Sequence, residues 1–267
     1  IYVSNNSDRV VIRYNFCFEN KAAGIQLNPD LSSGSPGLSY GVEIYNNICY
    51  NNRIGLNLQG LYESYVYNNL IYNNGSNNGG NGITLFHGDA ASGCNDVYVI
   101  NNTVVVPSGS QWAILAIDGD LLKIYNNILI SFSPKGCLDI ESSCTNIFSD
   151  YNILNDKITT DQGNSYINFK QWQNKGYDLH SILVTDNAHL FKDIIINDYH
   201  LAELSEARNS GTNLFTSFIY SDLDKEKRPQ GMGCDIGCYE FKETTRIGDV
   251  RNLHDDFNWV NQNGYLI

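Results

Sequence analysis

The sequence predicts an all-β protein, a right-handed parallel β-helix that ends in an irregular C-terminal cap containing a short helix. Three observations support this: an asparagine that recurs along the chain, alternating polarity around each copy, and a second short apolar strand after each copy. The recurring residues are Asn15, Asn47, Asn69, Asn102, Asn127 and Asn152, spaced by 32, 22, 33, 25 and 25 residues. Repeats of this length indicate stacked structural units.

Short strands are expected on both sides of each recurring asparagine. Apolar residues alternate with polar ones there, as in Val42-x-Ile44 before Asn47, and a period of two indicates a strand. No two-residue Asn-Gly connection joins two such strands, so hairpins are not expected. We therefore predict one coil per repeat, with neighbouring coils ~4.8 Å apart. The second strands of the five complete repeats are residues 25–27, 56–58, 83–85, 114–116 and 138–140.

Stacking explains why asparagine recurs at one position of the repeat. A buried amide is costly unless all its hydrogen-bonding groups are paired. An asparagine placed over the asparagine of the next coil can donate to one neighbour and accept from the other. We therefore predict a ladder of asparagine side chains through the interior of the coils.

The repeat divides the chain into three parts. Residues 1–150 are expected to form the coils, residues 151–241 the C-terminal capping region and residues 242–267 a tail or linker. Further coils are expected before Ile1, because no cap precedes the first repeat. Phe169 and Trp172 indicate a short helix with Trp172 in the core, and the segment from His180 to Glu240 is expected to cover the open edge of the last coil.

Composition limits the possible partners. The chain has 29 acidic and 17 basic residues, a net charge of −12 and a pI near 4.7, which argues against nucleic acid as a partner. No run of 18 apolar residues occurs, so no membrane insertion is expected. We expect a monomer.

The seven cysteines do not form an obvious disulfide framework, because their number is odd. Cys17 and Cys49 each follow a ladder asparagine by two residues, so they should be stacked neighbours in the core. A disulfide or two small buried hydrophobic side chains would both fit that position. Cys137 and Cys144 form a second possible bridge.

Several segments near the C-terminus resemble those of a known class of protein. Residues 169–172 read Phe-Lys-Gln-Trp, residues 197–201 Asn-Asp-Tyr-His-Leu and residues 235–240 Asp-Ile-Gly-Cys-Tyr-Glu. Together they resemble the C-terminal part of secreted bacterial right-handed β-helix proteins of the pectate-lyase-like class. The resemblance implies a secreted or cell-surface protein, extracellular or periplasmic, that acts on or is attached to polysaccharide. These motifs are structural, so they transfer no catalytic residue.

Two long connections, residues 28–41 and 87–96, follow the second strand of their coils and are expected to form the walls of a cleft. The floor would be the outward side chains of that strand in successive coils. The predicted substrate-binding residues are Gln26, Arg53, Asn57, Gln59, Tyr62, Thr84 and Phe86.

Three activities are compatible with such a cleft. The first is β-elimination on a uronic acid, with Ca²⁺ to neutralise the substrate carboxylate and a base such as His87, or Lys21, Arg53 or Lys135. The expected Ca²⁺ ligands are Asp118, Asp120, Asp139 and Glu141.

The second activity is hydrolysis by two carboxylates. Asp30 and Asp89 leave coils that are two apart, which suggests a separation on the order of 9.6 Å, near that of an inverting glycosidase. His87 would tune the acid, while Tyr62 and Phe86 would contact sugar faces.

The third possibility is a non-catalytic binding, adhesive or spacer module of a larger surface protein. The floor is poor in titratable groups, which favours this alternative. The sequence does not decide between enzyme and module.

Overall fold

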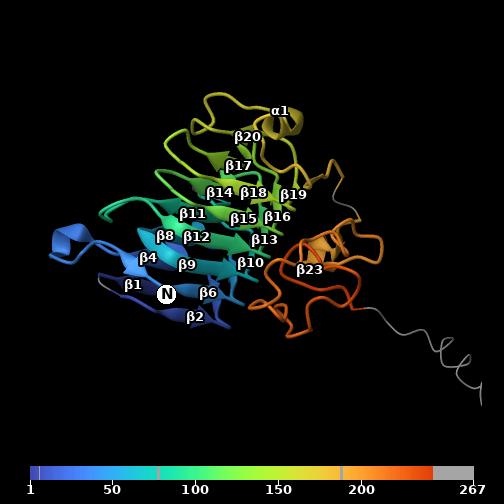
Figure 1. The fold of residues 1–267 in the computed structure, drawn as a ribbon, viewed down its shortest axis with the longest axis horizontal. Coiled ribbons are helices and arrows are strands. Elements are labelled where there is room, and N and C mark those ends of the chain that lie inside the picture. The colour runs from blue at the N-terminus through green and yellow to red at the C-terminus, as the bar shows by residue number, and fades with distance from the viewer. Residues whose placement is uncertain (6, 77–78, 187–188, 243–267) are drawn as a thin grey trace, which may run out of the picture.

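The computed structural model describes residues 1–5, 7–76, 79–186 and 189–242, and most of its regular structure lies in three long parallel sheets (Figure 1). Each turn of the chain adds one strand to each sheet. This is the architecture expected of a parallel β-helix. The predicted tail falls almost entirely outside the described residues.

We name the three sheets A, B and C. Sheet A consists of β1 (Tyr2–Ser4), β4 (Ala23–Asn28), β8 (Ile54–Gln59), β11 (Ile83–Phe86), β14 (Trp112–Ala116), β17 (Gly136–Ile140) and β20 (Ile158–Thr159). Sheet B consists of β2 (Val11–Arg13), β6 (Glu43–Tyr45), β9 (Leu61–Tyr67), β12 (Asn95–Ile100), β15 (Lys123–Tyr125) and β18 (Phe148–Asp150), with β5 (Ser39–Tyr40) paired to β9. Sheet C consists of β3 (Phe16–Phe18), β7 (Ile48–Tyr50), β10 (Leu70–Tyr72), β13 (Thr103–Val106), β16 (Ile128–Ser131), β19 (Ile153–Leu154) and β21 (Ile182–Leu183).

The predicted asparagine ladder is confirmed at the turn between sheets B and C. The Asn69 Oδ1 accepts hydrogen bonds from the backbone N and from the Nδ2 of Asn47, both at 3.0 Å. The same pair of bonds joins Asn69 to Asn102 and Asn102 to Asn127. All these side chains are fully buried, so each copy satisfies a polar group that would be costly alone.

The ladder ends on a carboxylate at the last coil. Asn152 donates from Nδ2 to the Oδ1 of Asp178 at 2.9 Å, and Ser181 donates to the same oxygen at 2.6 Å. Ser149 and the indole Nε1 of Trp172 donate to Oδ2 at 2.7 and 2.6 Å. Trp172 lies in α1 (Phe169–Gln173) and is buried in the core of the coils, as predicted.

A second, shorter ladder stands at the turn between sheets C and A. The Asn52 Oδ1 accepts from the Nδ2 of Asn20 at 2.7 Å, and the Asn74 Oδ1 accepts from the Nδ2 of Asn52 at 3.0 Å. This ladder was not predicted, although Asn20, Asn52 and Asn74 each follow the corresponding residue of the first ladder by five. It fixes the backbone of the turns that enter sheet A in the first three coils.

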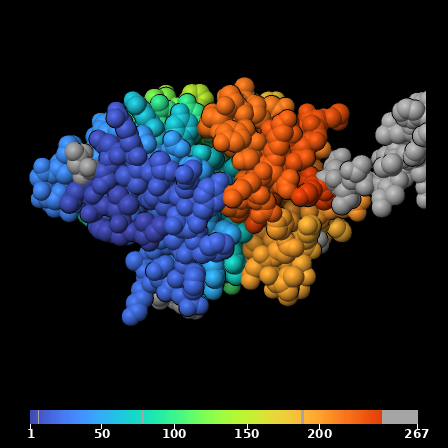
Figure 2. All heavy atoms as spheres, turned by 90° about the horizontal axis from the view of Figure 1, so that it is seen from below, coloured from blue at the N-terminus to red at the C-terminus, as the bar shows by residue number. Residues whose placement is uncertain are grey.

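The C-terminal segment, residues 190–241, packs on the flank of sheet C instead of over the last coil, as Figures 1 and 2 show. Its regular elements are β22 (Phe191–Asp193), η2 (Ile194–Ile196) and β23 (Asp198–Leu201). Outward residues of sheet C, including Val105 and Ile130, pack against Tyr199 and Ile236. The expectation that all of His180 to Glu240 covers the last coil is therefore wrong, because the outer face of sheet C is itself apolar.

The first asparagine has a separate role in three of the Asn-Asn pairs. Asn68, Asn101 and Asn126 have positive φ values of 51°, 52° and 55° at the turn, so their side chains point away from the core ladder. Asn101 donates to the backbone oxygens of Asp235 and Gly237 at 3.1 and 3.2 Å. Asn68 donates to Ser221 O and Asn126 to Thr212 O, so these residues hold the C-terminal segment.

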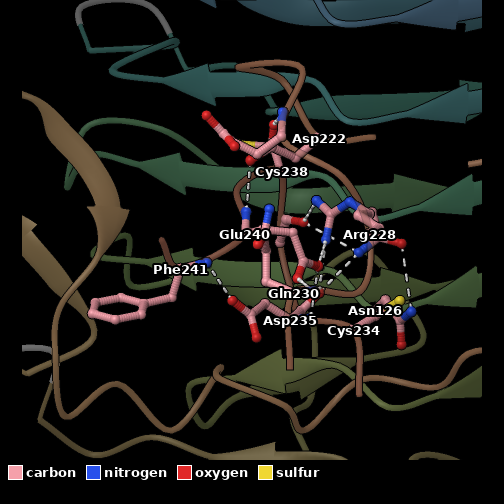
Figure 3. A network of polar contacts seen from close by, with 12 residues as sticks. Asn126, Asp222, Arg228, Gln230, Cys234, Asp235, Cys238, Glu240 and Phe241 are labelled. Atoms are coloured by element: carbon pink, nitrogen blue, oxygen red, sulfur yellow. Dashed lines mark hydrogen bonds and ion pairs between the residues drawn. The ribbon is translucent and has the colours of Figure 1, made fainter. Parts of the chain in front are cut away.

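A buried ionic network completes this contact (Figure 3). Arg228 donates from Nη1 to the Oε1 of Glu240 at 2.6 Å, and both side chains are fully buried. Its Nη2 reaches Asn68 Oδ1 at 3.2 Å and Gly237 O at 2.7 Å. Asp235 accepts the backbone N–H of Asn209 at 2.7 Å, which ties a second part of the segment to the network.

All seven cysteines are free. Cys17 and Cys49 are neighbours in register, as predicted, and the small-hydrophobe alternative holds for them. The possible Cys137–Cys144 bridge is not formed. Cys137 lies in the core with its thiol directed at Asn155 O, 2.8 Å away, while the thiol of Cys144 accepts from the backbone N of Gly119 at 3.3 Å.

Candidate functional site

The outward side chains of sheet A form the columns expected from the repeat. Cα pairing runs from Gln26 to Asn57, Thr84, Leu115, Asp139 and Thr159 through six consecutive strands. Gln59 pairs with Phe86 in the next column. Thr159 is not among the residues predicted from the sequence, although Ile158-Thr159 repeats the pattern of Leu138-Asp139 one coil later.

The two long loops do not stand apart as walls. The backbone N of Leu31 donates to Asp89 O at 3.0 Å, and the N of Ala91 donates to Gly37 O at 2.9 Å. The loops are thus joined to each other over the first coils. Gln59 lies beneath them, since its Oε1 accepts from the backbone N of Asp89 at 2.8 Å.

This arrangement changes the roles expected for Asp30 and Asp89. The Oδ1 of Asp30 accepts from the backbone N and the hydroxyl of Ser32 at 2.8 and 2.6 Å, so Asp30 caps the short helix η1 (Leu31–Ser33). Asp89 is bonded through its backbone to the residue after Asp30. The loops therefore bring these two residues together locally, and the spacing of two coils does not set their separation.

His87 lies beside a carboxylate at the carboxyl edge of sheet A. Its Nδ1 is 4.0 Å from the Oδ2 of Asp118, and both side chains are half exposed. The two residues follow β11 and β14 in adjacent coils. An imidazole and a carboxylate are side chains that can transfer protons when a substrate lies between them.

The four predicted Ca²⁺ ligands do not converge. Asp118 faces His87, whereas Asp120 lies at the edge of sheet B, where Thr145 and Asn146 donate to its Oδ1. These hydrogen bonds lower the pKa of Asp120. Asp139 and Glu141 remain on sheet A. Within the described part of the chain, no group of three or more His, Cys, Asp or Glu side chains is arranged to hold a metal ion.

Asp139 is a buried carboxyl on the outer face of sheet A. Thr159 donates to its Oδ2 at 2.5 Å, while its Oδ1 has no hydrogen-bond partner. Burial raises the pKa of Asp139 to about 6, and the negative charges of Glu141 and Asp161 add to the rise, while the bond from Thr159 opposes it. Asp139 therefore changes charge between mildly acidic and neutral pH.

Unpartnered buried acceptors follow the outer face of sheet A along the stack. Asn57 Oδ1 and Asp139 Oδ1 lie in one column, and Asn28 Oδ1 and Glu141 Oε1 lie in the next. The indole Nε1 of Trp112 is a buried donor without a partner at the start of β14. Buried polar atoms are nearly always paired in folded proteins, so these exceptions call for a partner such as ordered water or a ligand, although Asn46 Oδ1 and Arg228 Nε are also unpartnered away from sheet A.

Of the remaining predicted substrate-binding residues, Tyr62 and Arg53 lie away from this row, whereas Phe86 lies in its second column. Tyr62 is on sheet B, where its hydroxyl is 2.8 Å from the Oγ of Ser92 and its ring contacts Tyr40. Arg53 is exposed at the opposite, amino edge of sheet A. Phe86 is half-buried at the carboxyl edge, next to His87.

No protein-family model matches the chain, and no curated protein matches it. Among the residues that the structure describes, none of the helices has both the length and the apolar character needed to cross a bilayer.

Proposed function

We propose that the protein is a secreted or cell-surface β-helix of the pectate-lyase-like class that binds a polysaccharide on the outer face of sheet A. The resemblance of residues 169–172, 197–201 and 235–240 supports the class and the location. A right-handed winding is part of this proposal, because parallel crossover connections are right-handed in about 98% of cases. The C-terminal segment covers the flank of sheet C and leaves the outer face of sheet A to the ligand. We also propose that the protein acts as a monomer.

The row of unpartnered acceptors is the observation that carries the proposal. Asn28, Asn57, Asp139 and Glu141 each present a buried oxygen that lacks a donor. A saccharide offers hydroxyl donors at regular intervals, and pairing them with these oxygens removes a penalty of ~1–3 kcal/mol for each group. To meet all four, a linear polymer would have to span the ~14 Å between Asn57 and Asp139, which lie three strand spacings apart, and one further spacing to Asn28.

The reaction that best fits this face is hydrolysis of a glycosidic bond. Asp139, with its raised pKa, would donate a proton to the leaving oxygen once a side-chain rotation exposes its buried carboxyl, and Glu141 would act as the base for water. Residues two apart in an extended chain have Cα atoms ~6.6–6.8 Å apart, which allows the two carboxyl groups to reach the separation of about 6.5–9.5 Å used by inverting glycosidases.

A non-catalytic binding module is the second candidate. Asp139 is fully buried, and Asp30 is used as a helix cap. A face that binds a saccharide through amide and hydroxyl groups without exposing an acid would act only as a receptor. This alternative keeps the same ligand and the same surface.

A panel of uncharged and uronic-acid polysaccharides separates these candidates. The purified chain would be incubated with and without Ca²⁺, and both reducing ends and unsaturated products would be measured. Hydrolysis predicts new reducing ends without unsaturation, with activity lost in Asp139→Asn and Glu141→Gln and kept in the control Glu206→Gln, an exposed residue remote from sheet A.

Each other outcome has a defined meaning. Unsaturated products that require Ca²⁺ would replace hydrolysis by the lyase reaction and support the predicted Ca²⁺ cofactor. Binding without any product would support the module. Absence of binding to every polysaccharide would refute the proposed function.

A further inference from the structure

A cavity of ≈410 Å³ opens at the turn between sheets C and A in the first three coils. It lies at the amino edge of sheet A, whereas Glu141 and His87 lie at the carboxyl edge. The cavity is therefore separate from the row of unpartnered acceptors. Its lining includes Glu19, Lys21, Asn51, Arg53, Asn73 and Ser76.

Unequal turn lengths create this cavity. The first two coils enter sheet A through short turns, whereas the third coil makes a longer excursion between Tyr72 and Ile83. The start of that excursion is anchored by a bond from the Gly75 N to Asn52 O at 2.8 Å. Gly75 has a φ of 80°, and a Cβ there would lie 2.7 Å from the Ser110 Oγ, so glycine is required.

Two cations line the cavity from adjacent coils. Lys21 and Arg53 directly follow Asn20 and Asn52, whose side chains are joined in the second ladder, so the two side chains leave neighbouring turns at the same position. Both are exposed, and within the described residues neither makes an ion pair. Glu19 also lines the cavity, which leaves it one positive charge in a chain of net charge −12.

We infer that this cavity binds the anionic group of a saccharide, a carboxylate or a sulfate ester, as a second contact outside the sheet A face. The guanidinium of Arg53 suits a planar or tetrahedral oxyanion through paired N–H groups, and Lys21 adds a point charge. Asn51 and Ser76 supply polar groups for neighbouring hydroxyls. The saccharide nature of the ligand rests on the proposed function, whereas the anion preference rests on the cavity itself.

Titration calorimetry on the full chain tests this inference with three oligosaccharides of equal length, one uncharged, one of uronic acids and one sulfated. The variant Lys21→Gln/Arg53→Gln is compared with Lys170→Gln/Lys175→Gln, which removes two exposed cations elsewhere and changes the net charge equally. We expect the first variant to bind at least one of the acidic ligands about tenfold more weakly. The control should stay within about twofold, and the advantage of the acidic ligand should fall as salt rises.

The outcomes distinguish this inference from the proposed function. Loss confined to the uronic-acid ligand or to the sulfated ligand identifies which oxyanion the cavity takes. Equal affinity of Lys21→Gln/Arg53→Gln and wild type for both acidic ligands would overturn the inference, as would equal losses in the control variant. Tight binding of the uncharged ligand alone would also overturn it, while the proposed function would stand.

Discussion

The coils and the C-terminal segment solve the problem of buried polar groups in opposite ways. Inside the coils the repeated polar side chains are neutral asparagines, and each copy bonds to the next, as Asn69 does with Asn47 and Asn102. Inside the C-terminal segment they are charged and occur once, around Arg228 and Glu240. Repetition lets a neutral side chain pair with its own copies, whereas a single-copy segment needs a dedicated set of partners.

The difference has an electrostatic consequence. Arg228 is accompanied by three buried acids, Asp222, Asp235 and Glu240, and burial raises the pKa of each. Backbone N–H groups stabilise their charged forms, as the N of Glu240 does for the Oδ2 of Asp222 at 2.7 Å. Arg228 is therefore the shared counter-charge of all three acids, with Arg208 also acting on Asp235, whereas in the ladder the hydrogen bonds are spread over several equivalent residues.

The largest effect is expected from Arg228→Met. Removal of one partner from a buried ion pair costs ~3–5 kcal/mol, because the remaining carboxylates stay buried without a counter-charge. Limited proteolysis with mass spectrometry should show residues 190–241 cleaved while the coils stay intact. Lys175→Met serves as the control, and simultaneous loss of the coils would show that the two regions unfold as one.

A smaller effect is expected from Asn102→Ala. This change removes the acceptor of the Asn69 N and Nδ2 and the donor to Asn127, so the free energy of unfolding should fall by about 3 kcal/mol. Asn15→Ala, at the partly exposed first rung, should cost about 1 kcal/mol. Urea unfolding compares the two, and equal losses would mean that the interior of the ladder contributes no more than its edge.

Asp139 is a buried acid within the coils, and its pH dependence sharpens the comparison. Because its folded pKa is raised to about 6 from 3.8, its stabilising effect is complete below pH 3.8 and is lost as the pH rises through 6. Asp139→Asn should therefore stabilise the protein above pH 6 by up to about 3 kcal/mol and have little effect below pH 4. Unfolding by urea from pH 4 to pH 8 measures this, and a constant difference would refute the raised pKa.

The smallest effect is expected from Asn101→Gly. Glycine keeps the positive φ of the turn but removes the donor to Asp235 O and Gly237 O, so the C-terminal segment should be destabilised by about 1 kcal/mol. Proteolysis of residues 190–241 is the readout. A loss as large as that of Asn102→Ala would contradict the division of labour between the two asparagines of a pair.

The sequence predicts the structural features that recur in every coil and misses those that occur in a single coil. The ladder and the columns of sheet A follow from local pattern and spacing. The joined loops do not, because the contact between Leu31 and Asp89 connects segments without any common pattern. Asp30 did carry a local signal, since Asp-Leu-Ser-Ser is typical of a helix cap.

For the candidate site, the sequence predicted only which residues align on sheet A. Gln26, Asn57, Thr84 and Asp139 align as expected, but the burial that raises the pKa of Asp139 does not follow from the strand pattern. The contact of the C-terminal segment with the flank of sheet C had a weak signal in the sequence. The residue before the ladder asparagine is asparagine at positions 46, 68, 101 and 126 and tyrosine at positions 14 and 151, and the C-terminal segment accepts hydrogen bonds from Asn68, Asn101 and Asn126.

The carboxylate of Asp178 gives the ladder a direction. Each asparagine from Asn15 to Asn127 donates from its backbone N and its Nδ2 to the Oδ1 of the asparagine in the next coil, so the ladder has a donating end and a receiving end. Asp178 receives from four donors and passes nothing on. Extra coils would therefore have to be inserted before Asn152. An asparagine inserted there can accept from one neighbour and donate to the other, whereas the carboxylate of Asp178 can only accept.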